Sequence, residues 1–456
     1  MRDELTPEER LLVLMSFAAL DAEEEAAACT AAAAVRDWDG FVDLAEANAT
    51  APLVHHRLAA TALDGVVPAP ARARLAAIAD AVTAQNTARL AVGTQLLARL
   101  AARGVPVVLL KGVLLAETVY RNSFYKKMND IDILVRPADL DTVFGVYQEL
   151  GLFSAAELVG GAPRKQEKFS HHAPPFFSRD LACMIGTHWG LITPLAPYKL
   201  DLDGIWSRVR ELDFLGVPAR AMAPEDNLHH LCVHLPYYKT GIRELADIYN
   251  LVRHHAAELD WERFHAEVRR ARTEDLVYHA LALAHRLAPR PDLGAALAVL
   301  RRRVSWYATR DTARKTARVA TLLRSRSVHM SRIEKAYADF RSTQSAAEKR
   351  RAFGKILGGI VYPPAADVAR LSSLDRPGRA AWLAARIAAP WRISRVFVRD
   401  LGAGIYAAML AKCAIEVAAA TVRDAVAPAA ADDHAAYAAR LGVTPADLAR
   451  LKDALE

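Results

Sequence analysis

Apolar residues recur at helical spacing over most of this chain, and the pattern predicts a largely helical protein. Residues 82–103 show it clearly, and Gly104 follows their basic last turn, which is a common way for a helix to end. After residue 222 the same spacing predicts successive amphipathic helices over 224–235, 242–255 and 260–271. We expect helices to continue to the end of the chain, with a break at Tyr362-Pro363-Pro364.

Short apolar runs replace the helical spacing between residues 105 and 189. Residues 105–110 and 131–135 form continuous runs rich in β-branched side chains, as is typical of buried strands. The pattern also predicts strands over 175–178 and 181–189, and helices over 113–121 and 139–151. We therefore predict an α+β protein in which a small mixed-sheet module is embedded in a largely helical chain.

The alternation of these patterns divides the chain into four parts. A length of 456 residues, at roughly 150 residues per domain, fits two to four units. We expect an N-terminal helical cap, an α/β module, a helical domain and a C-terminal helical region, over residues 1–81, 82–215, 216–300 and 301–456.

Composition indicates a cytoplasmic protein. The four cysteines lie far apart without paired spacing, which argues against a disulfide framework or a zinc knuckle. The charged N-terminus, MRDELTPEERLL, is not a signal peptide. The most apolar late segment, 401–422, carries Lys412 and Glu416, so we expect no membrane span.

The formal net charge is +7, and much of the excess lies over residues 301–351. Such a segment could bind a polyanion. Because it has no aromatic platform beyond Trp306 and Tyr307, a solvated helix face is the favoured interpretation. Nucleic acid is therefore not expected as a partner, although a nucleic-acid-directed transferase that uses this segment stays a third hypothesis.

Asp130 and Asp132 form the sharpest local signal. On a strand, alternate side chains share a face, so both carboxylates point the same way while Ile131 and Ile133 point to the core. Two partly buried carboxylates repel each other unless a cation neutralises them. Oxygen ligands of this kind suit Mg²⁺ bound together with substrate phosphates. For an isolated Asp-x-Asp, a solvent-facing strand end paired with a lysine would be the simpler interpretation.

Lys111-Gly112 lies between a predicted strand and a predicted helix, about 20 residues before this acid pair. Glycine allows close approach of the backbone to a phosphate, the helix N-terminus offers unpaired N–H groups, and the lysine adds a positive charge. The phosphate turn and the acid pair together supply both halves of a metal–triphosphate site.

These segments resemble a known family. Residues 104–112, Tyr120 and residues 128–135 are similar to a family of largely uncharacterised bacterial nucleotidyltransferases within the polymerase-β superfamily. That family often accompanies biosynthetic gene clusters, including those for lasso peptides. The similarity continues through Thr187-His188-Trp189, residues 223–226, His234 and residues 243–248.

The resemblance implies a polymerase-β-like module that transfers a nucleoside monophosphate from an NTP to a small-molecule or peptide acceptor and releases pyrophosphate. Asp130 and Asp132 would coordinate Mg²⁺ or Mn²⁺, and Lys111-Gly112 would replace the Gly-Ser phosphate turn of the superfamily.

The chain departs from the family where a third acid is expected, two residues before the His-Trp pair, because Gly186 stands there. The lost ligand and base could be replaced by His188, or by Asp201 and Asp203, although a polar turn is the favoured interpretation of the latter pair. The alternative function is a catalytically degraded, nucleotide-binding scaffold in a biosynthetic complex.

Lys239 and Arg243 lie between two predicted helices and could contact a triphosphate or a base, or could be ordinary surface charges. His230 and His234 lie one turn apart upstream of Asp247, where packing is a better explanation than metal binding. The sequence identifies neither the acceptor nor the oligomeric state.

Overall fold

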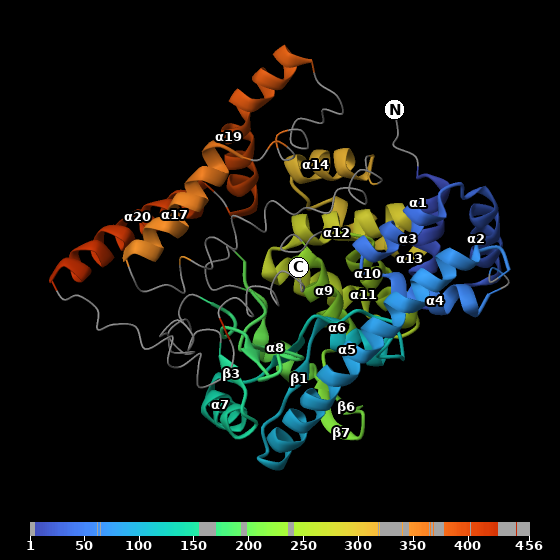
Figure 1. Cartoon of the computed structure of the whole chain (residues 1–456), viewed down its shortest axis with the longest axis horizontal. Helices are drawn as coiled ribbons and strands as arrows, with labels where there is room; N and C mark the ends of the chain where they lie inside the picture. The colour runs from blue at the N-terminus through green and yellow to red at the C-terminus, as the bar shows by residue number, and fades with distance from the viewer. Residues whose placement is uncertain are drawn as a thin grey trace.

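The chain is represented by a computed structural model, which describes residues 5–61, 63, 65–154, 170–192, 198–235, 241–317, 319, 340, 346–363, 365, 368, 378–401, 403–426 and 444. One seven-stranded mixed sheet is embedded in a largely helical chain (Figure 1), which confirms the predicted fold class. No helix within the described ranges is long and apolar enough to cross a membrane.

The N-terminal part consists of short helices packed beside one long helix. Their bounds are α1 (Pro7–Met15), α2 (Ala22–Ala34), α3 (Trp38–Ala47), α4 (Ala51–Ala59) and α5 (Ala69–Ala102). Thr6 with Glu9, and Asp21 with Glu24, form capping boxes that start α1 and α2. Helix α5 is 34 residues long and continues from the cap into the sheet module, so one helix belongs to both parts.

The sheet has the strand order β3-β4-β5-β2-β1-β7-β6. The strands are β1 (Val108–Leu109), β2 (Ile131–Leu134), β3 (Phe153–Ser154), β4 (Phe176–Phe177), β5 (Met184–His188), β6 (Arg210–Phe214) and β7 (Val217–Ala221). Strand β1 pairs antiparallel with β2, and β2 pairs parallel with β5. Strands β6 and β7 form a hairpin whose turn residues, Leu215 and Gly216, both have positive φ.

Helices α5 and α7 (Leu140–Glu149) cover one face of the sheet. Leu97 and Leu100 of α5 and Tyr147 of α7 share a core with Ile131 and Ile133 of β2. The approach of α5 is close, because a Cβ at Gly93 would lie 2.4 Å from Cδ1 of Ile131. The acidic face of β2 is thereby turned away from this core.

The remaining elements are η1 (Pro137–Asp139) and a series of further helices, which lie beside the sheet and beyond it. These are α6 (Lys111–Thr118), α8 (Leu202–Arg208), α9 (Pro224–His234), α10 (Ile242–His254), α11 (Trp261–Ala271), α12 (Glu274–Leu287), α13 (Pro291–Arg301), α14 (Trp306–Thr316), α17 (Ala346–Val361), α19 (Arg379–Leu401) and α20 (Ala403–Val426). Helices α9 to α13 share one core, and α17, α19 and α20 share another. The predicted break is observed at Tyr362 and Pro363, after the end of α17, whereas Pro364 lies outside the described residues.

Candidate active site

Strand β2 places Asp132 on the face opposite the core, as the alternating pattern predicted for this residue. Ile131 and Ile133 are fully buried in the α5-facing core, and Asp132 lies on the other face, 5% exposed. Asp130 precedes the strand and is half-buried. Two carboxylates therefore lie close together where water reaches them poorly.

Lys111 forms an ion pair with Asp132 at the start of α6. Its Nζ lies 2.8 Å from Oδ2 of Asp132, and the backbone N–H of Leu110 donates to the carbonyl oxygen of Asp132 over 3.0 Å. Pairing of β1 with β2 places the end of β1 beside the acids, and the chain then turns into α6. The residue in the left-handed region is Lys111, with φ +51°, rather than Gly112.

Strand β5 brings Gly186 and His188 to the same place. The parallel register pairs Asp132 with Gly186 and Leu134 with His188. A Cβ at Gly186 would lie 2.1 Å from Oδ1 of Asp132, so no side chain fits there while Asp132 holds this position. That same Oδ1 is 2.9 Å from Nε2 of His188. Both oxygens of Asp132 are thus bonded, one to Lys111 and one to His188.

Burial and the charges of this cluster shift the pKa values of the two acids in opposite directions. Burial and the charge of Asp132 raise the pKa of Asp130 from 3.8 to about 7. Burial also opposes ionisation of Asp132, but Lys111 and His188 outweigh it and hold the pKa of Asp132 well below its usual range. Asp132 is therefore ionised at neutral pH, while Asp130 sits where further negative charge is costly and a cation would be favourable.

His188 is a neutral imidazole at neutral pH. Burial and the charge of Lys111 lower the pKa of His188 from 6.5 to about 4. A neutral imidazole that bonds an ionised carboxylate through Nε2 donates its proton there, so Nδ1 carries the lone pair. This Nδ1 is buried and has no hydrogen-bond partner among the residues that the structure describes. The pair of Asp132 and His188 therefore has the composition and tautomer of an oriented general base.

Arg89 on α5 is a cation that the sequence analysis did not identify. Its side chain is buried, its Nε and Nη1 have no hydrogen-bond partner, and its charge lowers the pKa of Asp130. Burial lowers the pKa of Arg89 itself. Two buried guanidinium nitrogens without a partner among the described residues are unfavourable unless an anion completes them. Its signal in the sequence is weak: Asn86 and Arg89 are polar residues on the otherwise apolar face of α5.

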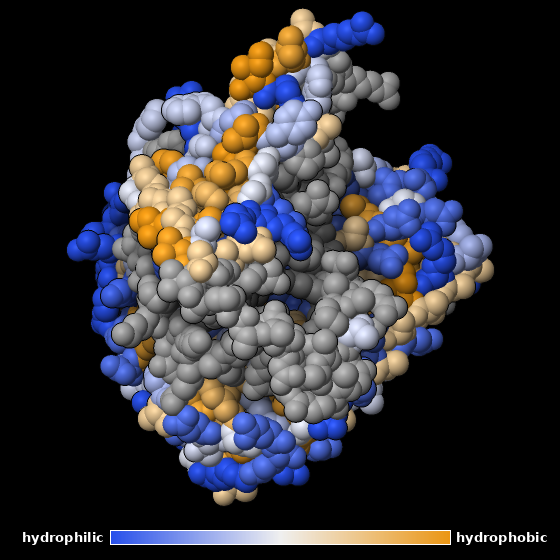
Figure 2. Space-filling view, turned by 60° about the vertical axis from the view of Figure 1, so that its left-hand side comes forward, coloured by the Kyte–Doolittle hydropathy of each residue, from blue (hydrophilic) through white to orange (hydrophobic). Residues whose placement is uncertain are grey.

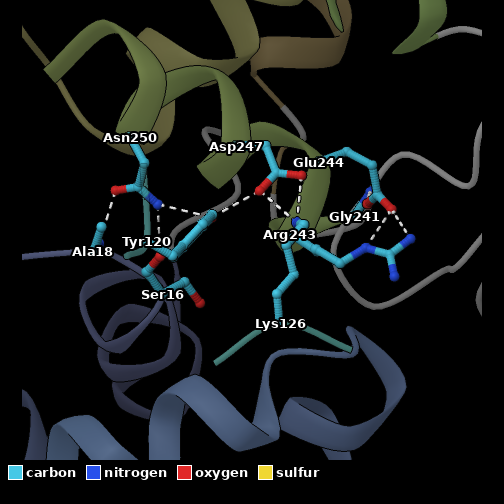
Figure 3. A network of polar contacts seen from close by, with 9 residues as sticks. All are labelled: Ser16, Ala18, Tyr120, Lys126, Gly241, Arg243, Glu244, Asp247 and Asn250. Carbon is cyan, nitrogen blue, oxygen red and sulfur yellow. Dashed lines mark hydrogen bonds and ion pairs between the residues drawn. The ribbon is translucent and has the colours of Figure 1, made fainter. Parts of the chain in front are cut away.

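Arg243 approaches the acids from the first turn of α10. Its Nη2 and Nε donate to Oε1 of Glu244 over 2.7 and 3.0 Å, and Oε2 of Glu244 accepts from the backbone N–H of Gly241 (Figure 3). The charge of Arg243 also lowers the pKa of Asp130. Lys239, predicted beside it, lies outside the described residues.

A buried polar network fixes α10 against the segment that leads into β2. Nζ of Lys126 lies 2.6 Å from both carboxylate oxygens of Asp247, and the hydroxyl of Tyr120 donates to Asp247 over 2.7 Å (Figure 3). Asn250 donates to the Tyr120 hydroxyl and to the carbonyl of Ser16 in the N-terminal cap. The network therefore connects α10, which carries Arg243, to the segment that leads to the acid pair.

A family model described as "uncharacterised nucleotidyltransferase" matches residues 34–289. The chain belongs to this nucleotidyltransferase family. The match covers more than half of the chain and includes every site residue described above. No curated protein and no solved structure matches the chain. The sequence-based family assignment is thereby confirmed, whereas the association with lasso-peptide clusters stays a prediction.

The nucleotidyltransferase uses its other candidate residues structurally. Asp201 accepts from the backbone N–H of Gly204 over 3.0 Å, which caps α8, and pairs with Arg270 at 2.6 Å. Asp203 is exposed in the first turn of α8. This arrangement supports the polar-turn interpretation of the pair and leaves His188 as the substitute that contacts Asp132.

Histidines line the Lys111 side of the nucleotidyltransferase site. Burial, followed by the charge of Lys111, lowers the pKa values of His230 and His234 well below 6.5. The rings of His171 and His172 lie 5.6 and 5.3 Å from that of His188. The imidazoles of His230 and His234 therefore remain neutral and add no competing charge around the acid pair.

The donor set decides what kind of metal site is possible. Among the residues that the structure describes, no group of three or more His, Cys, Asp or Glu side chains could hold a metal ion. Mg²⁺, however, is commonly held by one or two carboxylates with phosphate oxygens and water as the other ligands. Burial and the neighbouring charge of Asp132 raise the pKa of Asp130, so a cation beside it would favour its ionised, metal-binding form. Asp130 and Asp132 therefore fit Mg²⁺ that arrives with a nucleotide.

Proposed function

We propose that this nucleotidyltransferase transfers a nucleoside monophosphate from an NTP to a hydroxyl of a small-molecule or peptide acceptor and releases pyrophosphate. The observation that supports this best is the ion pair, at 2.8 Å, between Lys111 at a helix start and the buried Asp132 of the acid pair. We place the reaction in the cytoplasm, in a biosynthetic role, and do not expect nucleic acid as the acceptor.

The triphosphate would bind at the start of α6. Lys111 and Gly112 are its first residues, and the first N–H groups of a helix have no partner within it. Arg89 and Arg243 add positive charge on the Asp130 side. A phosphate oxygen there would satisfy the buried guanidinium of Arg89 and would compete with Asp132 for Lys111.

Asp130 and Asp132 would hold Mg²⁺ or Mn²⁺ brought with the nucleotide. The bound ion would supply neutralisation of the triphosphate charge that builds up during transfer. In the structure, Lys111 neutralises Asp132. When a nucleotide binds, Lys111 would move from Asp132 to a phosphate oxygen, and the metal ion would take its place as the positive charge beside Asp132.

His188 would act as the general base in place of the missing third carboxylate. The proton on Nε2 would stay there, donated to Asp132, and Nδ1 would accept the proton of the acceptor hydroxyl. The hydroxyl oxygen would at the same time form a bond to the α-phosphorus. The bond from that phosphorus to the bridging oxygen breaks, and pyrophosphate leaves. Gly186 leaves room for Asp132 to hold this imidazole, because any side chain at residue 186 would displace the carboxylate.

A degraded, nucleotide-binding scaffold is the second candidate. The observation that favours it is Gly186, which removes one of the three acids expected from the family resemblance. This candidate predicts binding of an NTP without turnover, with any acceptor and any divalent metal.

Label transfer distinguishes the two. The protein is incubated with Mg²⁺ and NTP labelled at the α-phosphate, in a mixture of small molecules and peptides from the source cells. The proposal predicts a labelled product that needs Asp132, is lost in Asp132→Asn and persists in Asp203→Asn. Transfer of a γ-phosphate label instead, or no transfer despite nucleotide binding, would contradict it.

A further inference from the structure

Exposed apolar side chains concentrate on the C-terminal helices. Of the thirteen large apolar side chains that are exposed in the described part of the chain, nine belong to residues 357–422. Figure 2, in which the C-terminal helices come forward, shows orange apolar side chains beside blue hydrophilic ones in the upper part of the molecule. Scattered exposed apolar residues are ordinary, but a local concentration marks an interaction surface.

Helix α19 carries the clearest part of this surface. Leu383, Ile387 and Trp391 follow one another at intervals of four residues and are 61, 73 and 68% exposed. We call these three residues the α19 stripe. The opposite side of the helix is also apolar, and it is buried against neighbouring helices through Ala385, Ala389, Ile393 and Phe397. Helix α19 therefore has two apolar faces: one packs within the bundle, and the other, the stripe, is exposed.

Arginines flank the α19 stripe on both sides. At about 100° per residue, Arg379 and Arg386 fall on one side of the stripe, and Arg395 on the other. The helix contains five arginines and a single acid, Asp400, next to its last residue. The guanidinium of Arg386 is held 3.8 Å from the ring centre of Tyr362, which is 74% exposed. The aromatic ring of Tyr362 thus borders the same flank.

We propose that the α19 stripe binds the surface of an anionic lipid membrane, with the helix lying in the plane of the interface. Leu, Ile and Trp side chains enter the boundary between headgroups and acyl chains, and the flanking arginines meet anionic headgroups while their aliphatic stems cover apolar surface. The helix is not apolar enough to cross the bilayer, so it lies on the membrane.

Charge and shape favour this occupant over two others. A polynucleotide would use the arginines, but single-stranded nucleic acid binds through aromatic stacking platforms, and the middle of the stripe is aliphatic. A second copy of the chain would have to cover a convex helix that has cations on both sides and, among the described residues of α19, no acid beside the stripe to pair across a symmetric interface. A fluid anionic surface accommodates both features.

Vesicle flotation tests the proposal without depending on the transferase reaction. The full chain is mixed with vesicles of phosphatidylcholine alone or of phosphatidylcholine with phosphatidylglycerol. We expect preferential binding to the anionic vesicles, weakened by salt. Ile387→Ser/Trp391→Ser should lower the partition coefficient by about tenfold or more, because it removes most of the buried apolar area. Arg379→Gln/Arg395→Gln should lower binding to the anionic vesicles only.

Trp306→Ser is the matched control, since Trp306 of α14 is 73% exposed but lies outside the stripe. Its flotation should equal that of the wild type. Circular dichroism and light scattering on each variant separate loss of binding from unfolding. Wild-type protein that is folded yet stays unbound, or stripe variants that float unchanged, would overturn the proposal. It would also be overturned if Ile387→Ser/Trp391→Ser converted a dimer into a monomer.

Discussion

At the scale of residues, the candidate site is built from the contacts that single side chains make with Asp132. One oxygen of that carboxylate bonds Lys111 and the other bonds His188, while a glycine leaves the space between the strands open. The arrangement keeps Asp132 ionised and His188 neutral, with a lone pair on Nδ1. Each of these contacts can be removed separately.

His188→Gln should separate orientation from proton transfer. The amide nitrogen of glutamine can replace the Nε2–H donor to Asp132, but it provides no base at the position of Nδ1. We expect kcat to fall by about 10²–10⁴, as is usual for loss of a general base, with little change in the Kd for NTP. His279→Gln on α12, outside the site, is the control and should keep most of the activity. Nearly unchanged kcat in His188→Gln would show that another group takes the proton.

Gly186→Ala should test the space opposite Asp132. The added Cβ would lie 2.1 Å from Oδ1, so the carboxylate must leave Lys111 and His188. We expect urea denaturation to show a loss of about 1–3 kcal/mol in the free energy of unfolding. Gly145→Ala on α7, where a Cβ meets nothing within 4 Å, should instead be neutral or stabilising by up to about 1 kcal/mol. Equal effects of the two substitutions would contradict this packing.

The sequence predicted the part of the candidate site that is local in the chain. Asp130 and Asp132 alternate with core residues on one strand, and Lys111 begins the helix after the neighbouring strand, so short-range patterns were enough. Arg89 was missed because it lies in the middle of a long alanine-rich helix, and its proximity to Asp130 is created only by tertiary packing. The contact of His188 with Asp132 likewise depends on the β2–β5 register.

At the scale of elements, the strands differ in how well pattern predicted them. The runs at 105–110 and 131–135 are confirmed, although only Val108–Leu109 and Ile131–Leu134 form ladder pairs. Strand β3 has two residues, too few to show a period, and was not predicted. The hairpin of β6 and β7 was also missed, because β6 exposes most of its charged residues and its turn, Leu215-Gly216, lacks the usual polar first residue.

The network around Asp247 should fix α10 to the sheet module. Asp247→Ala leaves the buried ammonium of Lys126 without its partner, and we expect a loss of about 3–5 kcal/mol in unfolding free energy by urea denaturation. Lys126→Met/Asp247→Leu removes both charges and should recover at least half of that loss. A double variant as unstable as the single one would contradict the account. If the wild type bound a metal ion that Asp247→Ala did not bind, packing would not be the whole role of Asp247, and a metal site on this helix would have to be considered again.

For the whole molecule, buried neutral histidines should set the acid limit of stability. Burial lowers the pKa of His229 from 6.5 to about 4, and His188 has a similarly lowered value. Since the unfolded chain binds these protons more readily, stability is complete above about pH 6.5 and is lost as the pH falls toward about 4. His229→Gln should reduce that loss by up to about 3 kcal/mol.

The measurement is urea denaturation at several pH values for wild type and His229→Gln. The variant could be less stable at neutral pH, since His229 bonds Thr273 at 2.6 Å, but its stability should change less with pH. Parallel pH profiles for the two proteins would show that His229 does not titrate on unfolding in this range. Because the pKa of His229 is lowered in the folded state, removal of His229 should make the free energy of unfolding depend less on pH. A steeper dependence in the variant would contradict the account.

Calorimetric titration of each NTP with and without Mg²⁺ tests the central claim most directly. It uses the wild type, Asp130→Asn/Asp132→Asn, and Asp201→Asn/Asp203→Asn, which removes an acid pair of the same spacing outside the site. The account predicts that the wild type and the control pair bind an NTP only when the metal is present, and that Asp130→Asn/Asp132→Asn does not bind. Metal-independent binding that survives loss of Asp130 and Asp132, or no binding of any NTP by the wild type, would contradict it.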